Sequence, residues 1–185
     1  QVLHEPQGHW LTITNVGTQN PEIVRVYDSL YSSCSPSIQQ QIACMVNTAK
    51  PAITLEFIDV HRQKGSNDCG VFAVAYAVSL CLNEEPGNLS FNQPALRQHL
   101  IQCLEAGEFT SFPVLNLKRR QGFKVNSRQL VKVYCTCRLP KLSEIPMICC
   151  SNCHEWYHGE VCVAAIPKSA WNQRKEKWFC PVCKS

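Results

Sequence analysis

Four closely spaced pairs of metal-binding side chains occupy the C-terminal part of the chain. They are Cys135 and Cys137, Cys150 and Cys153, His158 and Cys162, and Cys180 and Cys183. Thiolates and imidazoles at such spacings are ligands of structural Zn²⁺, and eight of them are enough for two closed tetrahedral sites. A segment this short buries too little apolar surface to be stable alone, so metal coordination must supply the missing free energy. The sequence therefore predicts a small zinc-dependent domain over residues 131–185.

The other cysteines are distributed differently. The chain has 13 cysteines, and those outside the metal-ligand region stand singly inside apolar segments, at Cys34, Cys44, Cys69, Cys81 and Cys103. This usage is typical of a cytosolic or nuclear protein and not of a secreted disulfide scaffold. The sequence has no apolar stretch long enough to span a bilayer and no signal-peptide pattern at its start. We therefore expect an intracellular protein without membrane association.

The array of eight ligands resembles the plant homeodomain (PHD) finger, in which four cysteines, one histidine and three cysteines bind two zinc ions. The resemblance covers residues 134–183 and implies that the pairs interleave. One Zn²⁺ would be held by Cys135, Cys137, His158 and Cys162, and the other by Cys150, Cys153, Cys180 and Cys183. Three residues separate His158 from Cys162 where the family usually has two, so we expect a small bulge there. Cys149 is left as a spare thiol.

Many PHD fingers bind methylated lysine in an aromatic cage, where cation–π attraction replaces the lost hydration of the ammonium group. By position, the resemblance assigns the cage to Tyr134, Met147 and Trp156. Trp156 is the most informative of the three because an aromatic residue there faces the peptide groove. A histone tail is then the expected partner. The alternative is a finger with exposed aromatic side chains and no methyl-lysine activity.

A reactive thiol is the second feature with chemical meaning. The polar turn Asp68-Cys69-Gly70 leads into a mostly apolar run over residues 71–82, a length that suits a buried helix. Cys69 would lie at the N-terminus of this helix, where the helix dipole favours the thiolate, which is the nucleophilic form of cysteine. The alternative is that Cys69 is a small apolar core residue, as a single cysteine before such a helix often is.

Three polar residues could complete a catalytic group around this thiol. His9 begins a strand-like run over residues 9–14, and Asp28 ends a second one over residues 23–27. A hairpin of these strands could bring the two side chains to one end of a sheet, where His9 could serve as a base that Asp28 orients. The amide of Gln63 could hydrogen-bond an oxyanion that forms beside Cys69.

The elements of residues 1–112 follow the order strand, strand, helix, strand, helix, helix, which indicates an α+β domain. We expect the further helices from Pro36 to about residue 49 and from Gln93 to Gly107, and the third strand over residues 53–60. The apolar faces of the two helices would include Met45 on the first, and Leu96, Leu100, Ile101 and Leu104 on the second.

His9-Trp10, Asp28 at a strand end, Gln63 and Asp68-Cys69-Gly70 together resemble the ubiquitin-like-protein proteases, the SUMO-specific and related cysteine peptidases. The match covers roughly residues 1–106 and the C-terminal part of that catalytic domain, so we expect its N-terminal part to be missing from the sequence. The resemblance implies that Cys69 is the nucleophile, His9 the general base and Asp28 its orienting acid. Gln63 and the backbone N–H of Cys69 would form the oxyanion hole, and Trp10 would roof the tunnel for a diglycine tail.

The two halves of the chain differ in charge. Residues 1–117 carry five basic and ten acidic side chains, whereas residues 118–132 carry six basic and no acidic ones. We interpret residues 113–130, which include Lys118, Arg119 and Arg120, as a solvated basic linker. Nuclear localisation and contact with nucleic acid are the alternatives for this basic segment. The domains are then a protease part over 1–112, the linker, and the finger over 131–185.

These features predict a partial α+β cysteine-protease domain of papain-like fold, followed by a small cross-braced PHD finger with two structural zinc ions. The expected function is that of a thiol peptidase or isopeptidase acting on a ubiquitin-like modifier or its conjugates in the nucleus or nucleocytoplasm. The finger would recruit it, and we expect no direct binding of nucleic acid. The alternative is a chromatin-reading PHD protein whose protease half is an inactive, transposon-derived remnant.

Overall fold

The computed structural model describes residues 1–115, 122, 124–162 and 177–184. The chain divides into two compact units, one made of Gln1–Ile38 and Thr54–Leu130 and the other of Gln39–Ile53 and Val131–Ser185. The second unit takes up the residues predicted for the finger, and residues 39–53 belong to it as well. In the described ranges, no helix has both the length and the apolar character needed to cross a membrane.

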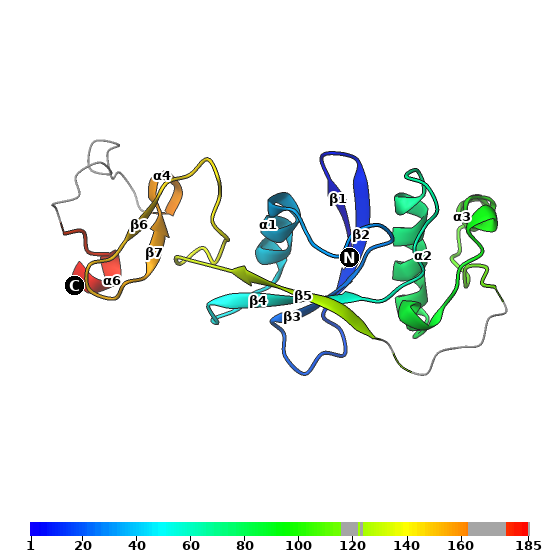
Figure 1. Cartoon of the computed structure of the whole chain (residues 1–185), viewed down its shortest axis with the longest axis horizontal. Helices are drawn as coiled ribbons and strands as arrows, with labels where there is room; N and C mark the ends of the chain where they lie inside the picture. The colour runs from blue at the N-terminus through cyan, green and yellow to red at the C-terminus, as the bar shows by residue number, and fades with distance from the viewer. Residues whose placement is uncertain (116–121, 123, 163–176, 185) are drawn as a thin grey trace. The chain divides into compact units, whose positions relative to one another are not determined.

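A five-stranded sheet in the order β1-β2-β3-β4-β5 carries most of the predicted strands (Figure 1). The strands are β1 (Val2–Glu5), β2 (His9–Thr14), β3 (Ile23–Tyr27), β4 (Ala52–Ile58) and β5 (Val125–Lys132). The β1–β2 and β2–β3 pairs are antiparallel, which confirms the hairpin predicted from residues 9–14 and 23–27. The β3–β4 pair is parallel because the chain crosses over through helix α1 (Pro36–Met45).

Strand β5 takes up residues 125–130 of the segment predicted as a linker. Its inward positions include Ser127 and Gln129, so the sequence lacks the apolar alternation that would reveal a strand. Side-chain hydrogen bonds replace that apolar contact. The Gln129 amide accepts from Cys34 N (2.8 Å) and donates to Cys34 O (3.2 Å), and the Ser127 hydroxyl donates to Ser32 O (2.9 Å). The residues 118–120 named for the basic segment lie outside the described residues.

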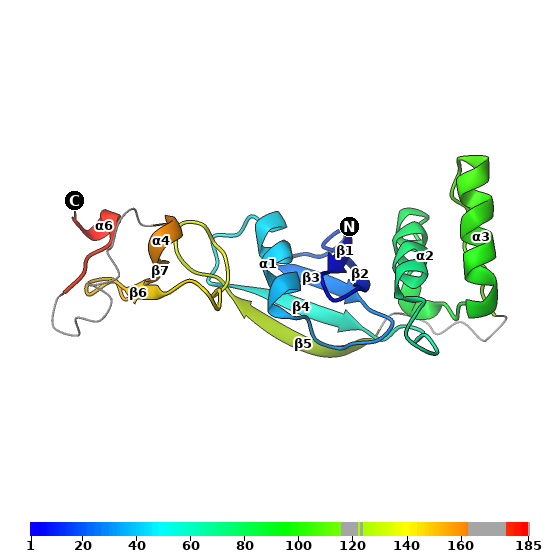
Figure 2. The same ribbon diagram turned by 90° about the horizontal axis from the view of Figure 1, so that it is seen from above.

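Helix α2 (Cys69–Cys81) is the buried helix that the apolar run predicts, and it is at the centre of the core of the first unit. Aromatic side chains from neighbouring elements pack against it, with Tyr76 and Phe91 5.6 Å apart between ring centroids. Helix α3 (Gln93–Ala106) follows the short 3-10 helix η1 (Pro86–Asn88) and lies beside α2 in both views (Figures 1 and 2). Gly107, in the left-handed conformation, ends α3 as predicted.

Several predicted core positions are wrong. Leu96 is fully buried and Leu100 is partly buried against the core, but Ile101 and Leu104 are exposed because the buried side of α3 runs through Leu96 and Cys103. Met45 is also exposed. Of the isolated cysteines, Cys34, Cys69 and Cys103 are buried, whereas Cys44 and Cys81 are exposed. Helix α1 ends at Met45, before the predicted end near residue 49, and the Thr48 hydroxyl accepts from Lys50 N (3.0 Å) in the turn that follows.

The second unit contains little regular structure. Strands β6 (Met147–Cys149) and β7 (Trp156–His158) form an antiparallel pair, and two short helices follow, α4 (Gly159–Cys162) and α6 (Pro181–Lys184). One buried cluster of this unit consists of Cys135, Cys150, Tyr157 and Cys180. Three of these four are candidate metal ligands, so we expect this cluster to depend on bound metal.

Candidate functional site

Two groups of metal-binding side chains come together in the second unit. One group is Cys135, Cys137, His158 and Cys162, and the other is Cys150, Cys153, Cys180 and Cys183. Within each group the candidate ligand atoms all lie within 4.8 Å of one another. Four thiol and imidazole ligands at such distances suit a tetrahedral metal ion. These are the two interleaved groups that the sequence pattern predicts.

The surroundings of His158 prepare it for a metal ion. Its Nε2 lies 3.0 Å from the carbonyl oxygen of Pro140, so Nε2 carries the proton and donates it there. Its Nδ1, which is 3.3 Å from Cys137 Sγ, is left with a lone pair that faces the ligand group. The additional residue between His158 and Cys162 lies in helix α4, so a helical turn takes the place of the expected bulge.

In the second ligand group, the surroundings of Cys150 favour the ionised form of its thiol. Its burial opposes the charged form, but the backbone N–H groups of Cys180 and Cys153 outweigh burial and lower the pKa of the Cys150 thiol to about 6. The Cys180 N–H group donates to Cys150 Sγ over 3.3 Å. These hydrogen bonds favour the thiolate, which is the form of cysteine that binds a metal ion. The neighbouring Cys149 lies outside both groups, as the spare thiol does in the sequence prediction.

The proposed cage residues lie in two settings. In the β6–β7 ladder, Met147 pairs with His158 and Cys149 pairs with Trp156, which makes Met147 and Trp156 diagonal neighbours on one face. The Trp156 side chain is 45% exposed, so it is available to a ligand. Tyr134 packs against the metal-binding core. Its role in a cage remains a prediction.

In the first unit, one strand and one helix align the candidate catalytic thiol with its base. His9 begins β2 and Cys69 begins α2. The buried Thr12 hydroxyl on β2 donates to Ala73 O on α2 over 2.6 Å, which fixes the strand against the helix. Cys69 Sγ lies 3.9 Å from Gly8 O, directly before His9. The two side chains line one pocket of about 500 Å³.

His9 and Asp28 form a buried pair. The Nε2 atom of His9 donates to Asp28 Oδ2 over 2.8 Å. The other carboxylate oxygen, Oδ1, accepts from Leu30 N (2.7 Å) and Tyr31 N (2.9 Å), which fixes the carboxylate. With the proton on Nε2, Nδ1 is an acceptor; it is buried and has no hydrogen-bond partner in the described part of the chain. Such a nitrogen can take a proton from a thiol.

Ser29 holds Gln63, a role that the sequence analysis missed. The Ser29 hydroxyl donates to Gln63 Oε1 over 2.6 Å. This hydrogen bond identifies the oxygen and the nitrogen of the Gln63 amide. Gln63 Nε2 donates one hydrogen to Gly65 O (2.9 Å), so a second N–H remains for an oxyanion. Because Ser29 follows Asp28 directly, adjacent residues orient the base and the oxyanion donor. A serine directly after the aspartate is therefore the sequence feature that could have indicated this role.

Trp10 lies beside the thiol. A Cβ atom on Gly70 would stand 3.5 Å from Trp10 Cδ1, so the indole covers the residue next to Cys69. The His4 ring packs on the indole with centroids 4.3 Å apart, and the indole is still 40% exposed. Its role as a tunnel roof remains a prediction.

A second thiol, Cys34, lines the same pocket as Cys69. Burial, followed by the charges of Asp28 and Glu5, raises the pKa of Cys34 to about 12. Cys34 is therefore a neutral thiol at physiological pH and a poor nucleophile. This leaves Cys69 as the candidate nucleophile of the pocket.

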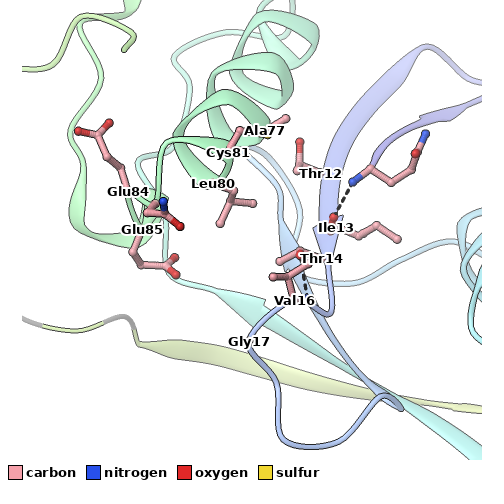
Figure 3. A pocket seen from close by; sticks show the side chains of 12 residues that line it. Thr12, Ile13, Thr14, Val16, Gly17, Ala77, Leu80, Cys81, Glu84 and Glu85 are labelled. Carbon is pink, nitrogen blue, oxygen red and sulfur yellow. Dashed lines mark hydrogen bonds between the residues drawn. The ribbon is translucent and has the colours of Figure 1, made fainter. Parts of the chain in front are cut away.

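A larger hollow of about 550 Å³ lies at the other end of the same strand and helix (Figure 3). Ala77 and Leu80 of α2 line it with apolar side chains, and Glu84 and Glu85 stand at its edge. The Glu85 carboxylate accepts from the Tyr27 hydroxyl (3.2 Å) and from Gly87 N (3.3 Å), so it has a structural role. Strand β2 and helix α2 therefore run in the same direction, and the thiol site lies where both begin.

Comparison with known proteins gives two partial similarities. The chain is 33% identical over 57 residues to the nucleosome-remodeling factor subunit NURF301 of Drosophila melanogaster, a match that covers 31% of this chain and 2% of that protein. It is 41% identical over 51 residues to the Lid2 complex component lid2 of Schizosaccharomyces pombe, covering 28% of this chain and 3% of that protein. The chain thus spans a very small part of the length of these relatives.

No family model and no solved structure matches the chain. The papain-like and PHD-type fold assignments therefore remain predictions. What the structure and the relatives establish is a mixed α and β chain with two metal-binding groups and a segment similar to chromatin proteins.

Proposed function

We propose that residues 131–185 form a PHD-type finger that binds two zinc ions and recognises a histone tail. The observation that carries the proposal is the pair of four-ligand groups, because their thiol and imidazole composition suits Zn²⁺. The similarity to a subunit named as part of a nucleosome-remodeling factor supports a chromatin partner. A nuclear location follows from the same proposal.

The methyl-lysine cage can be tested with peptides. We expect a histone-tail peptide carrying trimethyl-lysine to bind the chain, and Trp156→Ala to weaken binding about tenfold, because an exposed indole supplies a cation–π attraction of about 0.5–2 kcal/mol. Isothermal titration with methylated and unmodified peptides measures this. Val182→Ala is the control, because it removes a more exposed apolar side chain of the same unit. Equal affinity for the two peptides would exclude the cage.

We infer a second function for the first unit, that of a thiol peptidase for a ubiquitin-like modifier. It is favoured by the His9–Asp28 hydrogen bond, by His9 Nδ1, which is buried and has no hydrogen-bond partner among the described residues, and by the pocket that His9 and Cys69 both line. The finger would then recruit the peptidase to chromatin. The alternative, an inactive remnant, leaves the proposal for the finger unchanged.

The chemistry assigned to these residues is acyl transfer. Cys69 Sγ, after giving its proton to His9, forms a bond to the carbonyl carbon at the C-terminus of the modifier. The carbonyl oxygen becomes an oxyanion, to which Gln63 Nε2 and the Cys69 backbone N–H donate. His9 then protonates the departing amine as the C–N bond breaks. A water molecule that His9 deprotonates cleaves the thioester and restores the thiol.

An activity-based probe tests this function. We expect modifiers that carry a C-terminal electrophile to label the full chain at Cys69, which mass spectrometry would locate. Cys69→Ser should abolish labelling. Cys81→Ser should label like the wild type, because Cys81 is an exposed thiol at the opposite end of the same helix. Labelling that persists in Cys69→Ser, or no labelling of the wild type, would exclude the peptidase.

A further inference from the structure

The loop over residues 63–68 joins the candidate oxyanion donor to the candidate nucleophile, and the start of α3 holds it in place. The Gln93 side chain accepts from Lys64 N (2.8 Å) and donates to Lys64 O (2.9 Å). The same amide nitrogen donates to Asp68 Oδ2 over 2.6 Å. All three hydrogen bonds of the Gln93 amide therefore go to this one loop.

Gln63 and Lys64 are consecutive, so the loop is fixed from two sides. Ser29 holds the Gln63 amide on one side, and Gln93 holds the Lys64 backbone on the other. Movement at Lys64 would displace the Gln63 Nε2 atom. An oxyanion donor works only if it is already in place when charge develops, so this restraint acts on the chemical step.

The Asp68 carboxylate gives a second, independent indication. An aspartate that precedes a helix normally accepts from the free N–H groups of the first turn, but Asp68 makes no such bond to α2. Its oxygens are instead held by Gln93 Nε2 and by Arg97, whose Nε donates over 2.8 Å. The carboxylate is thereby turned away from the helix start, where the Cys69 N–H has to meet the substrate.

From these contacts we propose that Gln93 is a positioning residue of the thiol site, acting through the loop that carries Gln63 and through Asp68. The proposal depends on the peptidase function proposed above. Gln93 itself touches neither substrate nor the reacting atoms. Its loss should therefore lower the rate of acyl transfer and leave substrate binding and the reactivity of the thiol toward simple alkylation unchanged.

The experiment compares Gln93→Ala with Gln98→Ala in the full chain. Gln98 is an exposed glutamine of the same helix, so it controls for the loss of an amide from α3. Hydrolysis of a fluorogenic modifier substrate gives kcat and KM, and iodoacetamide gives the alkylation rate of Cys69, a displacement that forms no oxyanion. We expect Gln93→Ala to lower kcat at least about tenfold, with KM and alkylation within about twofold of the wild type.

Gln93→Glu sharpens the test. It keeps the acceptor for Lys64 N, loses both donated hydrogen bonds and places a carboxylate against Asp68, so its kcat should fall below that of Gln93→Ala. If kcat in Gln93→Ala equals that of Gln98→Ala, or if kcat falls together with the melting temperature while alkylation speeds up, the positioning role is wrong. A wild-type chain that no probe labels would overturn the peptidase itself, and this outcome is recognised without any Gln93 variant.

Discussion

Removal of the two metal ions should unfold residues 131–162 and 177–184, because the buried cluster around the two sites consists largely of their own ligands. Cys135, Cys150 and Cys180 are three of the four buried residues of this cluster, and Tyr157 is the fourth. Binding of structural zinc to finger peptides supplies about 10–16 kcal/mol at pH 7, far more than so small an apolar core. We expect amide hydrogen exchange to lose its protection over both ranges in a chelator and to recover it when Zn²⁺ is added.

The loss of protection should extend to residues 48–51. Val133 N donates to Pro51 O over 2.9 Å, and the Arg138 guanidinium donates to the carbonyl groups of Thr48 (3.2 Å) and Lys50. Arg138 follows the metal ligand Cys137 directly, so disorder of the first metal site would release these contacts. Helix α2 should keep its protection, since its core lies in the other unit.

Two adjacent cysteines provide the matched control. Cys150→Ser should reduce the metal content from two ions per chain to about one, and Cys149→Ser should leave it at two, because only Cys150 belongs to a ligand group. Metal analysis by mass spectrometry of the native chain distinguishes these results. A chain that keeps its exchange protection in the chelator, or one that loses metal in Cys149→Ser, would contradict the assignment of the ligands.

The metal sites could be predicted from the sequence because a coordination sphere accepts few spacings between ligands. The contacts that connect the two sites could not be predicted from the sequence. Glu155 Oε1 accepts from Cys135 N (3.2 Å), and the Glu155 carbonyl accepts from Cys150 N (2.9 Å), so one residue ties together the first ligands of both groups. A glutamate between ligands is common on any polar surface, and its spacing carries no such signal.

In the first unit too, only part of the structure could be predicted from the sequence. Helix α2 and the β2–β3 hairpin follow from apolar patterns that local physics imposes. Strand β5 does not, because Ser127 and Gln129 reach its partners through hydrogen bonds to the distant residues Ser32 and Cys34. Gln93 likewise meets Lys64 only after folding. Residues that act through distant backbone atoms need the structure to be found, whereas the residues that would carry out the chemistry stand in recognisable motifs.

Asp28→Asn should lower peptidase activity about 10³- to 10⁴-fold, even though the change replaces one oxygen by nitrogen. The Oδ1 position accepts from Leu30 N and Tyr31 N, so the amide must keep its oxygen there. Its NH₂ group then faces His9 Nε2, which has to become an acceptor. The proton of the neutral ring moves to Nδ1, which can then no longer take a proton from Cys69.

Turnover of the fluorogenic modifier substrate measures this loss, and Glu105→Gln is the control, since it makes the same change from carboxylate to amide at an exposed position of α3. His9→Ala should lose activity by at least as much, because it removes the base itself. The double variant should then be no worse than His9→Ala, since Asp28 acts only through the imidazole. If Asp28→Asn keeps the activity of Glu105→Gln, the buried pair is structural and another group must take the proton from the thiol.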